Sequence, residues 1–385
     1  MKNQYLFQLG AMSSLCWAEL QAVFPSAVLV QPHLALLESS DNLDAQATIA
    51  KLGGTVKIAQ VLKQLPSSST KEEIIAATSF LLQKDSQQKI YFALGELGRD
   101  HLEPLDSISI KEQLLEQGFK VRFAPTKRQG AGAGLLLHKK LREILVTSTP
   151  EGILLAQTVG VQDIDEWSRR DRGKPYANHK KGMLPPKLGR QMLNLARLPQ
   201  AARIWDPFSG TGTILLEAML MDNIATIYGS DLDSQAVSGS KQNLTWLTET
   251  SAPLLPQPFA TWHCFLSNAT TTTLAQLDGK KIDAIVSEPF LGKQTPREGD
   301  LANIFRGLEK LYWGCFRNWR TLLIAGAKVV LVFPKARDQR GREYHLNGLL
   351  DKLQTIGYTK CSRDLEYARP NALIRREICV FSFKG

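Results

Sequence analysis

The chain has 385 residues, too many for one small domain, so its length predicts two or three domains. Hydrophobic residues make up 43% of the sequence and charged residues 22%, a composition that supports folded cores and excludes a disordered chain. Lysine and arginine number 47 against 37 acidic residues. The resulting net charge of +10 favours a polyanionic partner but fits an ordinary basic protein equally well.

The five cysteines are scattered, odd in number and without a C-x-x-C pair, which argues against a disulfide framework and a zinc site. We expect no metal, and a reducing, cytoplasmic location fits this cysteine usage. We expect no signal peptide at residues 1–8, because Gln8 and Glu19 interrupt any apolar core. No run approaches the ~18 uninterrupted apolar residues of a membrane helix, so we expect a soluble protein with no membrane partner.

Residues 86–168 predict an α/β module. The expected strands cover residues 90–94, 121–123 and 153–157, and the expected helices cover residues 110–117 and 135–145. A basic loop and a basic helix face would be formed by Lys127, Arg128, Lys139, Lys140 and Arg142. Taken alone, the charges between 139 and 142 are better explained as a solvated helix face.

The segment 167–190 is more strongly basic, because it carries eight lysines and arginines against the single acid Asp171. These are Arg169, Arg170, Arg172, Lys174, Lys180, Lys181, Lys187 and Arg190. The same segment holds the rings of Trp167, Tyr176 and His179, which would be able to stack on bases. This combination predicts a surface for nucleic acid.

From about residue 200, short apolar runs alternate with segments of helix length, which is typical of a parallel sheet buried on both faces. The expected strands are residues 203–208, 225–230, 261–266, 282–286 and 328–333, with helical segments such as 214–221 and 302–322 between them. Two further runs, 360–367 and 376–383, are separated by eight residues, among them A-R-P-N-A at 368–372, which are too few for a crossover helix. We therefore expect a hairpin and an antiparallel last strand, an arrangement that resembles class I methyltransferases.

A glycine turn, D-P-F-S-G-T-G-T from Asp206 to Thr213, follows the first of these strands and opens a helix. Gly210 and Gly212 would let the backbone approach a ligand, and Ser209 and the helix start would offer hydrogen-bonding groups. The turn matches neither the P-loop pattern nor G-x-G-x-x-G. Its leading Asp206 suits a cationic amino-acid end better than a pyrophosphate, which favours S-adenosylmethionine over a dinucleotide.

Polar residues also follow the next two expected strands. Asp231 stands where a carboxylate accepts hydrogen bonds from ribose hydroxyls, and Asn268 stands where an adenine would lie. Each feature alone is often a packing device, a turn residue or a helix cap. Because the three occur in this order and spacing, we interpret them together as a cofactor site.

The fourth strand of this region ends at Ser287-Glu288-Pro289-Phe290. This motif resembles the amino-methyltransferase signature, which has Asp, Asn or Ser, then usually Pro, then Pro and an aromatic residue. Acceptors held rigidly at this point would grip an exocyclic amine and aim its lone pair at the methyl group, while the ring of Phe290 stacks on the base. Glu288 departs from the signature, and its carboxylate would be able to supply the charge that Ser287 lacks.

Four segments resemble the THUMP-domain tRNA guanosine N2-methyltransferases that modify position 10. They are residues 5–10 with 14–24, residues 52–59, residues 171–175 with 182–190, and residues 367–370 with 375–378. In that family the third segment covers the methionine end of S-adenosylmethionine, which implicates Met183. The resemblance extends over nearly the whole chain.

The resemblance implies an α/β protein with an N-terminal α+β ferredoxin-like domain (1–80), a THUMP RNA-binding domain (86–168) and a class I methyltransferase domain (172–385). The last would be doubly wound, with a seven-stranded sheet. We expect Lys127 and Arg128 of the second module, and Arg169, Arg172 and Lys174 of the basic segment, to contact tRNA. Eukaryotic relatives need a small activator subunit, which is a further candidate partner.

Two alternatives stay open. The first is methylation of rRNA, of another tRNA position or of adenine in DNA, although the THUMP resemblance argues against DNA. The second is an RNA-binding protein whose methyltransferase domain is degenerate, an alternative that the unusual Ser287-Glu288 pair keeps open.

Overall fold

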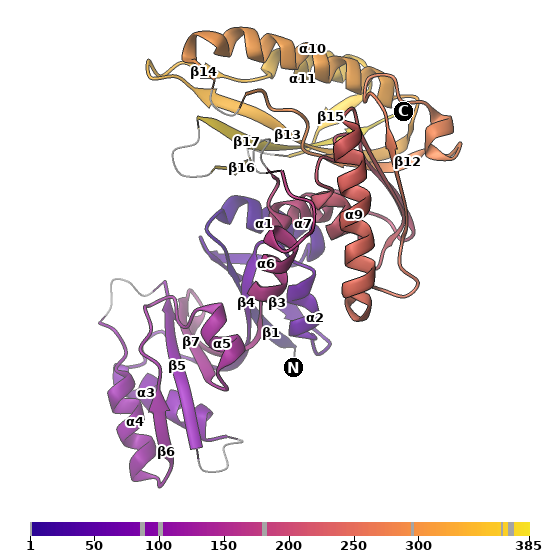
Figure 1. Cartoon of the computed structure of the whole chain (residues 1–385). Helices are drawn as coiled ribbons and strands as arrows, with labels where there is room; N and C mark the ends of the chain where they lie inside the picture. The colour runs from indigo at the N-terminus through magenta and orange to yellow at the C-terminus, as the bar shows by residue number, and fades with distance from the viewer. Residues whose placement is uncertain are drawn as a thin grey trace. The chain divides into compact units, whose positions relative to one another are not determined.

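A computed structural model describes residues 2–84, 89–98, 103–178, 183–293, 296–362, 365–368 and 373–385. The chain forms two compact units, Met1–Asp165 and Glu166–Gly385, coloured indigo to magenta and magenta to yellow in Figure 1. Within the described ranges, no helix is both long and apolar enough to cross a membrane.

The first unit is built on one eight-stranded sheet with the order β2-β3-β1-β4-β8-β7-β5-β6. Its strands are β1 (Asn3–Leu9), β2 (Val28–Gln31), β3 (Leu34–Ser39), β4 (Thr55–Leu65), β5 (Lys89–Leu97), β6 (Lys120–Phe123), β7 (Arg142–Thr149) and β8 (Gly152–Val161). Strand β5 runs parallel to β6 and β7, and the other pairs are antiparallel. Residues 1–80 and 86–168 thus contribute to one sheet, and their division into a ferredoxin-like and a THUMP domain stays a prediction.

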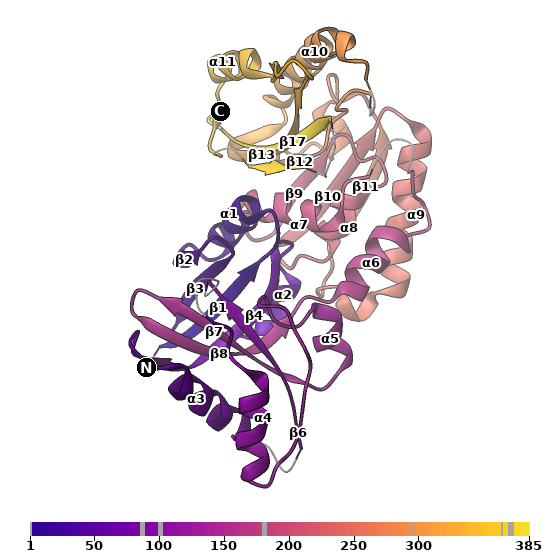
Figure 2. The ribbon, with the colours of Figure 1, turned by 90° about the vertical axis from the view of Figure 1, so that its left-hand side faces the viewer.

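Five helices cover this sheet: α1 (Ser13–Val23), α2 (Ala45–Ala50), α3 (Lys71–Gln83), α4 (Ser107–Glu116) and α5 (Ala133–His138). Helices α3 and α4 lie side by side and pack on β5 to β8, whereas α1 and α2 pack on β1, β3 and β4 (Figure 2). Local sequence fixes where these helices begin. Thr70 and Glu73 form a reciprocal capping box at α3, and Asp106 caps α4 through the backbone N–H groups of Ile108 and Ser109.

The helix expected over residues 135–145 is wrong. The chain there forms the short helix α5 and then the strand β7. Residues 144–146 are buried between β5 and β8, and a short apolar run of this kind does not distinguish a helix from a buried strand. Arg142 therefore lies on no helical face, and its guanidinium donates to the carbonyl oxygens of Leu81, Leu82 and Lys84 at the end of α3.

The second unit contains a nine-stranded sheet. Its strands are β9 (Ala202–Asp206), β10 (Ile224–Asp231), β11 (Thr261–Leu266), β12 (Ile282–Ser287), β13 (Leu323–Arg337), β14 (Glu343–Tyr344), β15 (Tyr358–Lys360), β16 (Glu366–Tyr367) and β17 (Ile374–Phe383). The main path, β11-β10-β9-β12-β13-β17-β15, is seven strands long, with β14 and β16 added at β13 and β17. Strands β9 to β13 are parallel and β17 is antiparallel to its neighbours, which confirms the expected fold class.

The run 360–367, expected as one strand, is divided in the structure. Strand β15 pairs with the end of β17 at Phe381–Phe383, and β16 pairs with Glu377 and Arg376 nearer its start. The hairpin residues 369–372, which include Arg369 and Pro370 of the family motif, lie outside the described residues.

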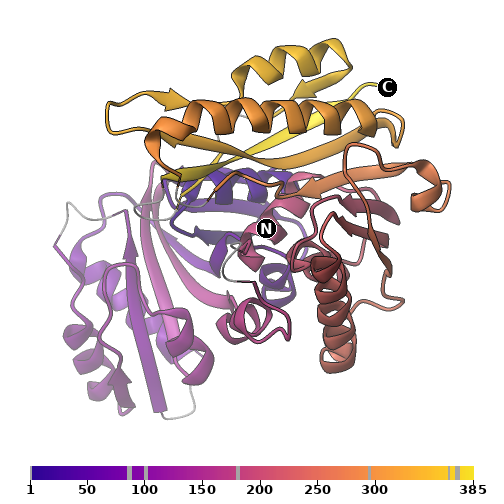
Figure 3. The ribbon, with the colours of Figure 1, turned by 45° about the horizontal axis from the view of Figure 1, so that its top comes forward.

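The helices of this unit are α6 (Ile164–Arg172, which begins just before the unit boundary), α7 (Pro186–Leu195), α8 (Thr213–Met219), α9 (Ser234–Thr250), α10 (Leu301–Trp319) and α11 (Asn347–Thr355). Single 3₁₀ turns occur at Ala252–Leu254, Leu274–Leu277 and Glu298–Asp300. Helices α10 and α11 run together over one face of the sheet (Figure 3). On β13, residues 329, 331 and 333 pack in the core with α10, whereas Val330 and Val332 are equally buried and point the opposite way. Both faces of the sheet are therefore covered, as a doubly wound fold requires.

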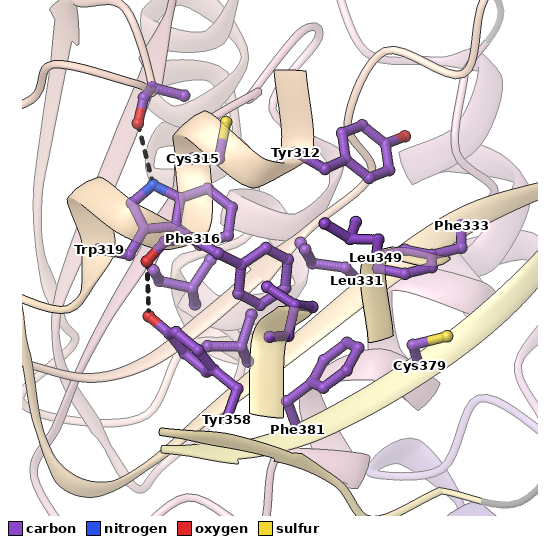
Figure 4. Packing of buried hydrophobic residues seen from close by; sticks show 14 of the residues in the cluster. Tyr312, Cys315, Phe316, Trp319, Leu331, Phe333, Leu349, Tyr358, Cys379 and Phe381 are labelled. Carbon is purple, nitrogen blue, oxygen red and sulfur yellow. Dashed lines mark hydrogen bonds between the residues drawn. The ribbon is translucent and has the colours of Figure 1, made fainter. Parts of the chain in front are cut away.

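An aromatic core holds α10 against the sheet (Figure 4). Phe316 meets Tyr358 and Phe381 edge-on, with ring centroids 4.9 and 5.3 Å apart. The indole N–H of Trp319 donates to the carbonyl oxygen of Ala269, and the hydroxyl of Tyr358 donates to that of Phe316, each over 3.1 Å. Because the buried indole of Trp319 and the buried phenols of Tyr358 and Tyr312 are all hydrogen-bonded, α10 is a firm support for the loops that follow β11 and β12.

Candidate cofactor and acceptor site

The glycine turn joins β9 to α8 at the carboxyl-terminal edge of the sheet. Gly210 and Gly212 have φ of 53° and 76°, a left-handed conformation that other residues rarely adopt, which explains both glycines. The turn is closed by the N–H of Gly212, which donates to the carbonyl oxygen of Ser209 over 2.7 Å. The spacing seen in the sequence therefore corresponds to a tight strand-to-helix turn.

Asp231, at the end of β10, is bonded to this turn. One carboxylate oxygen accepts from the N–H of Gly210 over 2.9 Å, and the other accepts from the N–H of Asp233 over 3.0 Å. The side chain is half-buried, so each oxygen keeps a lone pair for a further donor such as a ribose hydroxyl. The next residue, Leu232, is 74% exposed. It was not among the cofactor-binding residues expected from the sequence, although an apolar residue directly after this acid could have indicated a contact with the cofactor.

Ser209 supplies an observation in favour of a ligand at the turn. Its hydroxyl oxygen is buried and has no hydrogen-bond partner within the part of the chain that the structure describes. Buried polar atoms are almost always bonded, so an orphaned hydroxyl beside an open glycine turn fits a group that arrives with a ligand. Thr211 adds a second buried side chain of the same chemistry.

Asn268 follows β11, as expected, and is exposed. Its side-chain oxygen accepts from the N–H and hydroxyl of Thr270 over 3.0 and 2.8 Å, so the side chain is held in a local turn. Asn268 would therefore bind an adenine through a hydrogen bond donated by its amide nitrogen. Met183 is half-buried just before α7, whose Gly189 packs against Thr213 at the start of α8.

Ser287 ends β12 beside Asp206, which ends β9. Both residues are buried, and the Ser287 hydroxyl donates to the Asp206 carboxylate over 2.5 Å, while the N–H of Phe208 donates to the same oxygen over 3.1 Å. Burial raises the pKa of Asp206 to about 7, with the nearby carboxylates of Asp231 and Glu288 adding to the shift. Ser287 was expected to grip an amine directly. The structure directs the hydroxyl proton of Ser287 to Asp206 and leaves the lone pairs of its oxygen as acceptors, so a direct contact with an amine stays a prediction.

The remaining acceptor residues lie at the rim of the same edge. Glu288 is paired with Arg376 of β17, with 2.5 Å between its Oε1 and the arginine Nε, and it does not point freely into solvent. Pro289 is buried, whereas the ring of Phe290 is 59% exposed. The buried hydroxyl of Tyr312 on α10 donates to the carbonyl oxygen of Phe290 over 3.0 Å and fixes the backbone under that ring. Arg376 was noted only as part of the closing hairpin, because 88 residues separate it from Glu288.

In the first unit, Lys127 and Arg128 lie on a loop whose backbone is hydrogen-bonded to the strands β5 and β7. Glu143 of β7 is buried, pairs with Lys57 over 2.8 Å and accepts from the N–H of Ala131 over 2.5 Å. The N–H of Glu96 donates to the carbonyl oxygen of Arg128 over 2.7 Å. Lys127 is exposed on this fixed backbone, a placement compatible with the RNA contact expected for it.

The basic segment after residue 166 differs from the expected nucleic-acid surface. Lys174 is only 3% exposed, and its ammonium donates to the hydroxyl of Thr213 over 2.9 Å; burial lowers its pKa to about 8. The expected RNA contact of Lys174 is therefore corrected to a contact with the glycine-turn helix. Trp167 is also buried, stacked against Arg170, and so is unavailable for a base.

Two further charges of this segment, Arg170 and Arg190, form a buried group with Glu217 of α8. The guanidinium groups of Arg170 and Arg190 donate to the two carboxylate oxygens of Glu217 over 2.7 and 3.0 Å. Arg169 pairs with Glu166 and lies over the ring of Trp246, whereas Arg172 is exposed. Of the three expected RNA contacts in this segment, Arg172 alone is exposed. His179, Lys180 and Lys181 lie outside the described residues.

The strand order, the glycine turn and the following acid define this unit as a class I methyltransferase domain. A family model described as RMKL-like, methyltransferase domain, matches residues 174–355. Among solved structures, the alignment with TrmN from Thermus thermophilus covers 99% of this chain and 99% of TrmN. The TM-score is 0.53 and the identity 17%, which shows a common fold.

Three curated relatives give the family. The tRNA (guanine(10)-N2)-dimethyltransferase of Methanothermobacter thermautotrophicus is 31% identical over 41% of this chain and 40% of its own length. The probable tRNA (guanine(10)-N2)-dimethyltransferase of Methanothermococcus thermolithotrophicus is 32% identical over 32% of this chain and 70% of its own length. The tRNA (guanine(6)-N2)-methyltransferase of Thermus thermophilus is 28% identical over 40% of each chain. The chain spans less than half the length of the first of these relatives. Because it matches 70% of the second at 32% identity, it belongs to the tRNA guanine-N2 methyltransferase family.

Proposed function

We propose that this protein transfers a methyl group from S-adenosylmethionine to the exocyclic N2 amine of a guanosine in tRNA, at position 10. One observation carries the proposal: Asp206, at the start of the glycine turn, is hydrogen-bonded to Ser287, at the start of the acceptor motif. The ends of β9 and β12 therefore meet, and a methyl donor on the turn would face a base at the motif. Two relatives named for guanosine 10 supply the target.

The residues at the turn fit S-adenosylmethionine as the methyl donor. The backbone of Gly210 and Gly212 and the orphaned hydroxyl of Ser209 would hold its amino-acid end, with Met183 covering it. Asp206 would lie near the positive charges of the cofactor, which favour its ionised form. Asp231 would accept from the ribose hydroxyls, while Asn268 and the exposed side chain of Leu232 would contact the adenine.

The acceptor motif would hold the base. Phe290 would stack on the extruded guanine, and the carbonyl oxygens fixed by Pro289 and Tyr312 would position it. When bound, S-adenosylmethionine would supply the methyl group, with its sulfur as the leaving group that keeps the electron pair of the C–S bond. The N2 lone pair forms the new C–N bond, and the amine releases one proton to water. Glu288 would accept from an amine hydrogen, and Ser287 would position Asp206.

The first unit and the exposed arginine of the second would bind the tRNA. Lys127 and Arg128 on the fixed loop, together with Arg172, supply positive charge for phosphates. We assign the RNA-binding role to a THUMP domain at residues 86–168 and expect a cytoplasmic protein. An assay of the purified chain alone tests whether a small activator subunit is needed, since an active chain needs none.

Mass spectrometry of tRNA nucleosides, from cells with and without the gene, tests the proposal. We expect N2-methylated guanosine to disappear from tRNA when the gene is removed, and to return when purified protein and S-adenosylmethionine are added. Parallel reactions on rRNA and duplex DNA should give no product. A second candidate target is guanosine 6, favoured by the Thermus relative, and mapping of the modified position decides between the two. Absence of turnover on any RNA would favour a degenerate, RNA-binding protein.

A further inference from the structure

The pair formed by Glu288 and Arg376 has no place in the usual acceptor signature. Glu288 stands where that signature usually has proline, directly after β12, and Arg376 stands on β17 opposite Pro334 of β13. The two charged groups are 2.5 Å apart, and each side chain is 17% exposed. The carboxylate is thus largely withdrawn from solvent but still accessible at the rim of the acceptor motif.

Arg376 is restrained on three sides. Its backbone pairs with Tyr367 of β16 and with Pro334 of β13, its guanidinium lies 6.0 Å from the Tyr367 ring, and its Nε donates to Glu288. A planar guanidinium fixed in this way sets the orientation of the carboxylate that it binds. Since the hydrogen bond from Arg376 uses Oε1 of Glu288, that oxygen keeps one lone pair and Oε2 offers two more.

The chemistry of the two purines explains what such a carboxylate can recognise. The Watson–Crick edge of guanine presents two donors side by side, N1–H and the N2 amine. Adenine presents an acceptor, N1, beside its amine. A carboxylate has acceptors only, so it matches both guanine donors and faces an unfavourable acceptor–acceptor contact with adenine. A site built to accept from a donor strongly rejects an analogue that lacks it.

We propose that Glu288 selects guanine by accepting from both N1–H and the N2 amine, and that Arg376 is the positioning residue that orients its carboxylate. This inference rests on the proposed function, because it concerns the base that the same site would methylate. It assigns a role to the departure from the usual motif: the glutamate replaces a proline because the enzyme uses a side chain there to read the base.

The test uses the full chain and a tRNA transcript carrying guanosine or 2-aminopurine at the position that the wild type methylates. The analogue keeps the exocyclic amine but has an acceptor in place of N1–H. Single-turnover rates, followed by mass spectrometry of both methylated nucleosides, give the preference for guanosine. We expect wild type to prefer guanosine by on the order of 10–100-fold, as for a good two-point contact. In Glu288→Gln, whose amide can donate to the analogue's N1, the preference should fall to near parity.

The Arg376 variants separate positioning from support of the fold. Arg376→Gln should lower the preference severalfold, whereas Arg376→Lys, which keeps the charge, should retain more of it. Arg375→Gln is the matched control, because Arg375 is the preceding residue and pairs with Glu366 instead, over 3.1 Å. Equal loss on both transcripts, or an unaltered preference in Glu288→Gln, would overturn the inference while leaving the proposed function intact. A wild type that methylates no RNA would overturn both.

Discussion

The hydroxyl of Ser287 donates to the carboxylate of Asp206 over 2.5 Å, and this bond joins the ends of the neighbouring parallel strands β9 and β12. The two residues are 81 positions apart in the chain. Since one begins the glycine turn and the other begins the acceptor motif, a change at either residue is transmitted to the other half of the site.

The first prediction concerns Ser287. In Ser287→Ala, the buried carboxylate of Asp206 loses its hydroxyl donor, so the free energy of unfolding should fall by about 1.5–3 kcal/mol. Ser287→Asp restores the residue more frequent in the signature but places a second carboxylate against Asp206, so it should destabilise the fold further as pH rises. Denaturant unfolding of both variants measures this. A Ser287→Asp protein as stable as wild type at high pH would show that Ser287 does not face Asp206.

A second prediction follows from the pKa of Asp206, which burial raises to about 7. Its folded pKa lies above the unfolded value, so its stabilising contribution is present at low pH and is lost as pH rises through about 7. Binding of the cationic cofactor favours the ionised form, so affinity for S-adenosylmethionine should increase over the same range. Calorimetry across pH 7 should show this increase in wild type and not in Asp206→Asn. The amine of the free cofactor titrates identically in both experiments, so its contribution to the pH dependence is common to both proteins.

The third prediction tests the ribose assignment. Asp231→Ala removes hydrogen bonds to a charged acceptor, each worth about 1.5–3 kcal/mol, so affinity for S-adenosylmethionine should fall at least about tenfold. The variant also releases the N–H of Gly210. Asp233→Ala is the control, because Asp233 caps α9 through the N–H of Gln235 and should affect stability but little of the affinity. Unchanged affinity in folded Asp231→Ala would remove Asp231 from the site.

The division of the chain at residues 165 and 166 gives the fourth prediction. A protein comprising residues 166–385 keeps the glycine turn, Asp231 and the buried group around Glu217, so it should bind S-adenosylmethionine as tightly as the full chain. It should not methylate tRNA, because the first unit would supply the position of the target nucleotide. Calorimetry and a tRNA methylation assay on the same preparation check both halves. Methylation at the full rate would contradict the role given to the first unit.

The order of strands and turns along the chain made the place of these site residues predictable from the sequence. The glycine turn follows one buried strand, and Asp231 and Ser287 each end another, and the carboxyl ends of parallel strands meet at one edge of a sheet. Burial of charge was not predictable in this way. Lys174 and Arg170 look like an RNA surface in the sequence, and only the three-dimensional contacts with Thr213 and Glu217 show that they are enclosed.

Long-range pairing explains the other differences. Arg376 reaches Glu288 from β17, and no local pattern marks either residue as the other's partner. The start of β7, residues 142–145, was expected to belong to a helix over 135–145, and its neighbours β5 and β8 decide its conformation instead. Periodicity and spacing therefore located most strands and the turns at their ends. They did not predict which charges are buried or which residues pair, because contacts between distant parts of the chain decide both.

The last prediction concerns the exposed ring of Phe290, which has no role in the core and whose backbone Tyr312 already fixes. An aromatic face in that position stabilises an extruded base, at about 1–3 kcal/mol per stacked base. Phe290→Ala should therefore weaken capture of the tRNA target by on the order of 5–150-fold, with cofactor affinity and thermal stability unchanged. Phe259→Ala is the control, since that ring is also exposed but lies before β11, away from the acceptor motif. Single-turnover rates at increasing tRNA concentration separate capture from chemistry. If Phe290 only shields the backbone, its loss will lower stability instead, and the two variants will bind tRNA equally well.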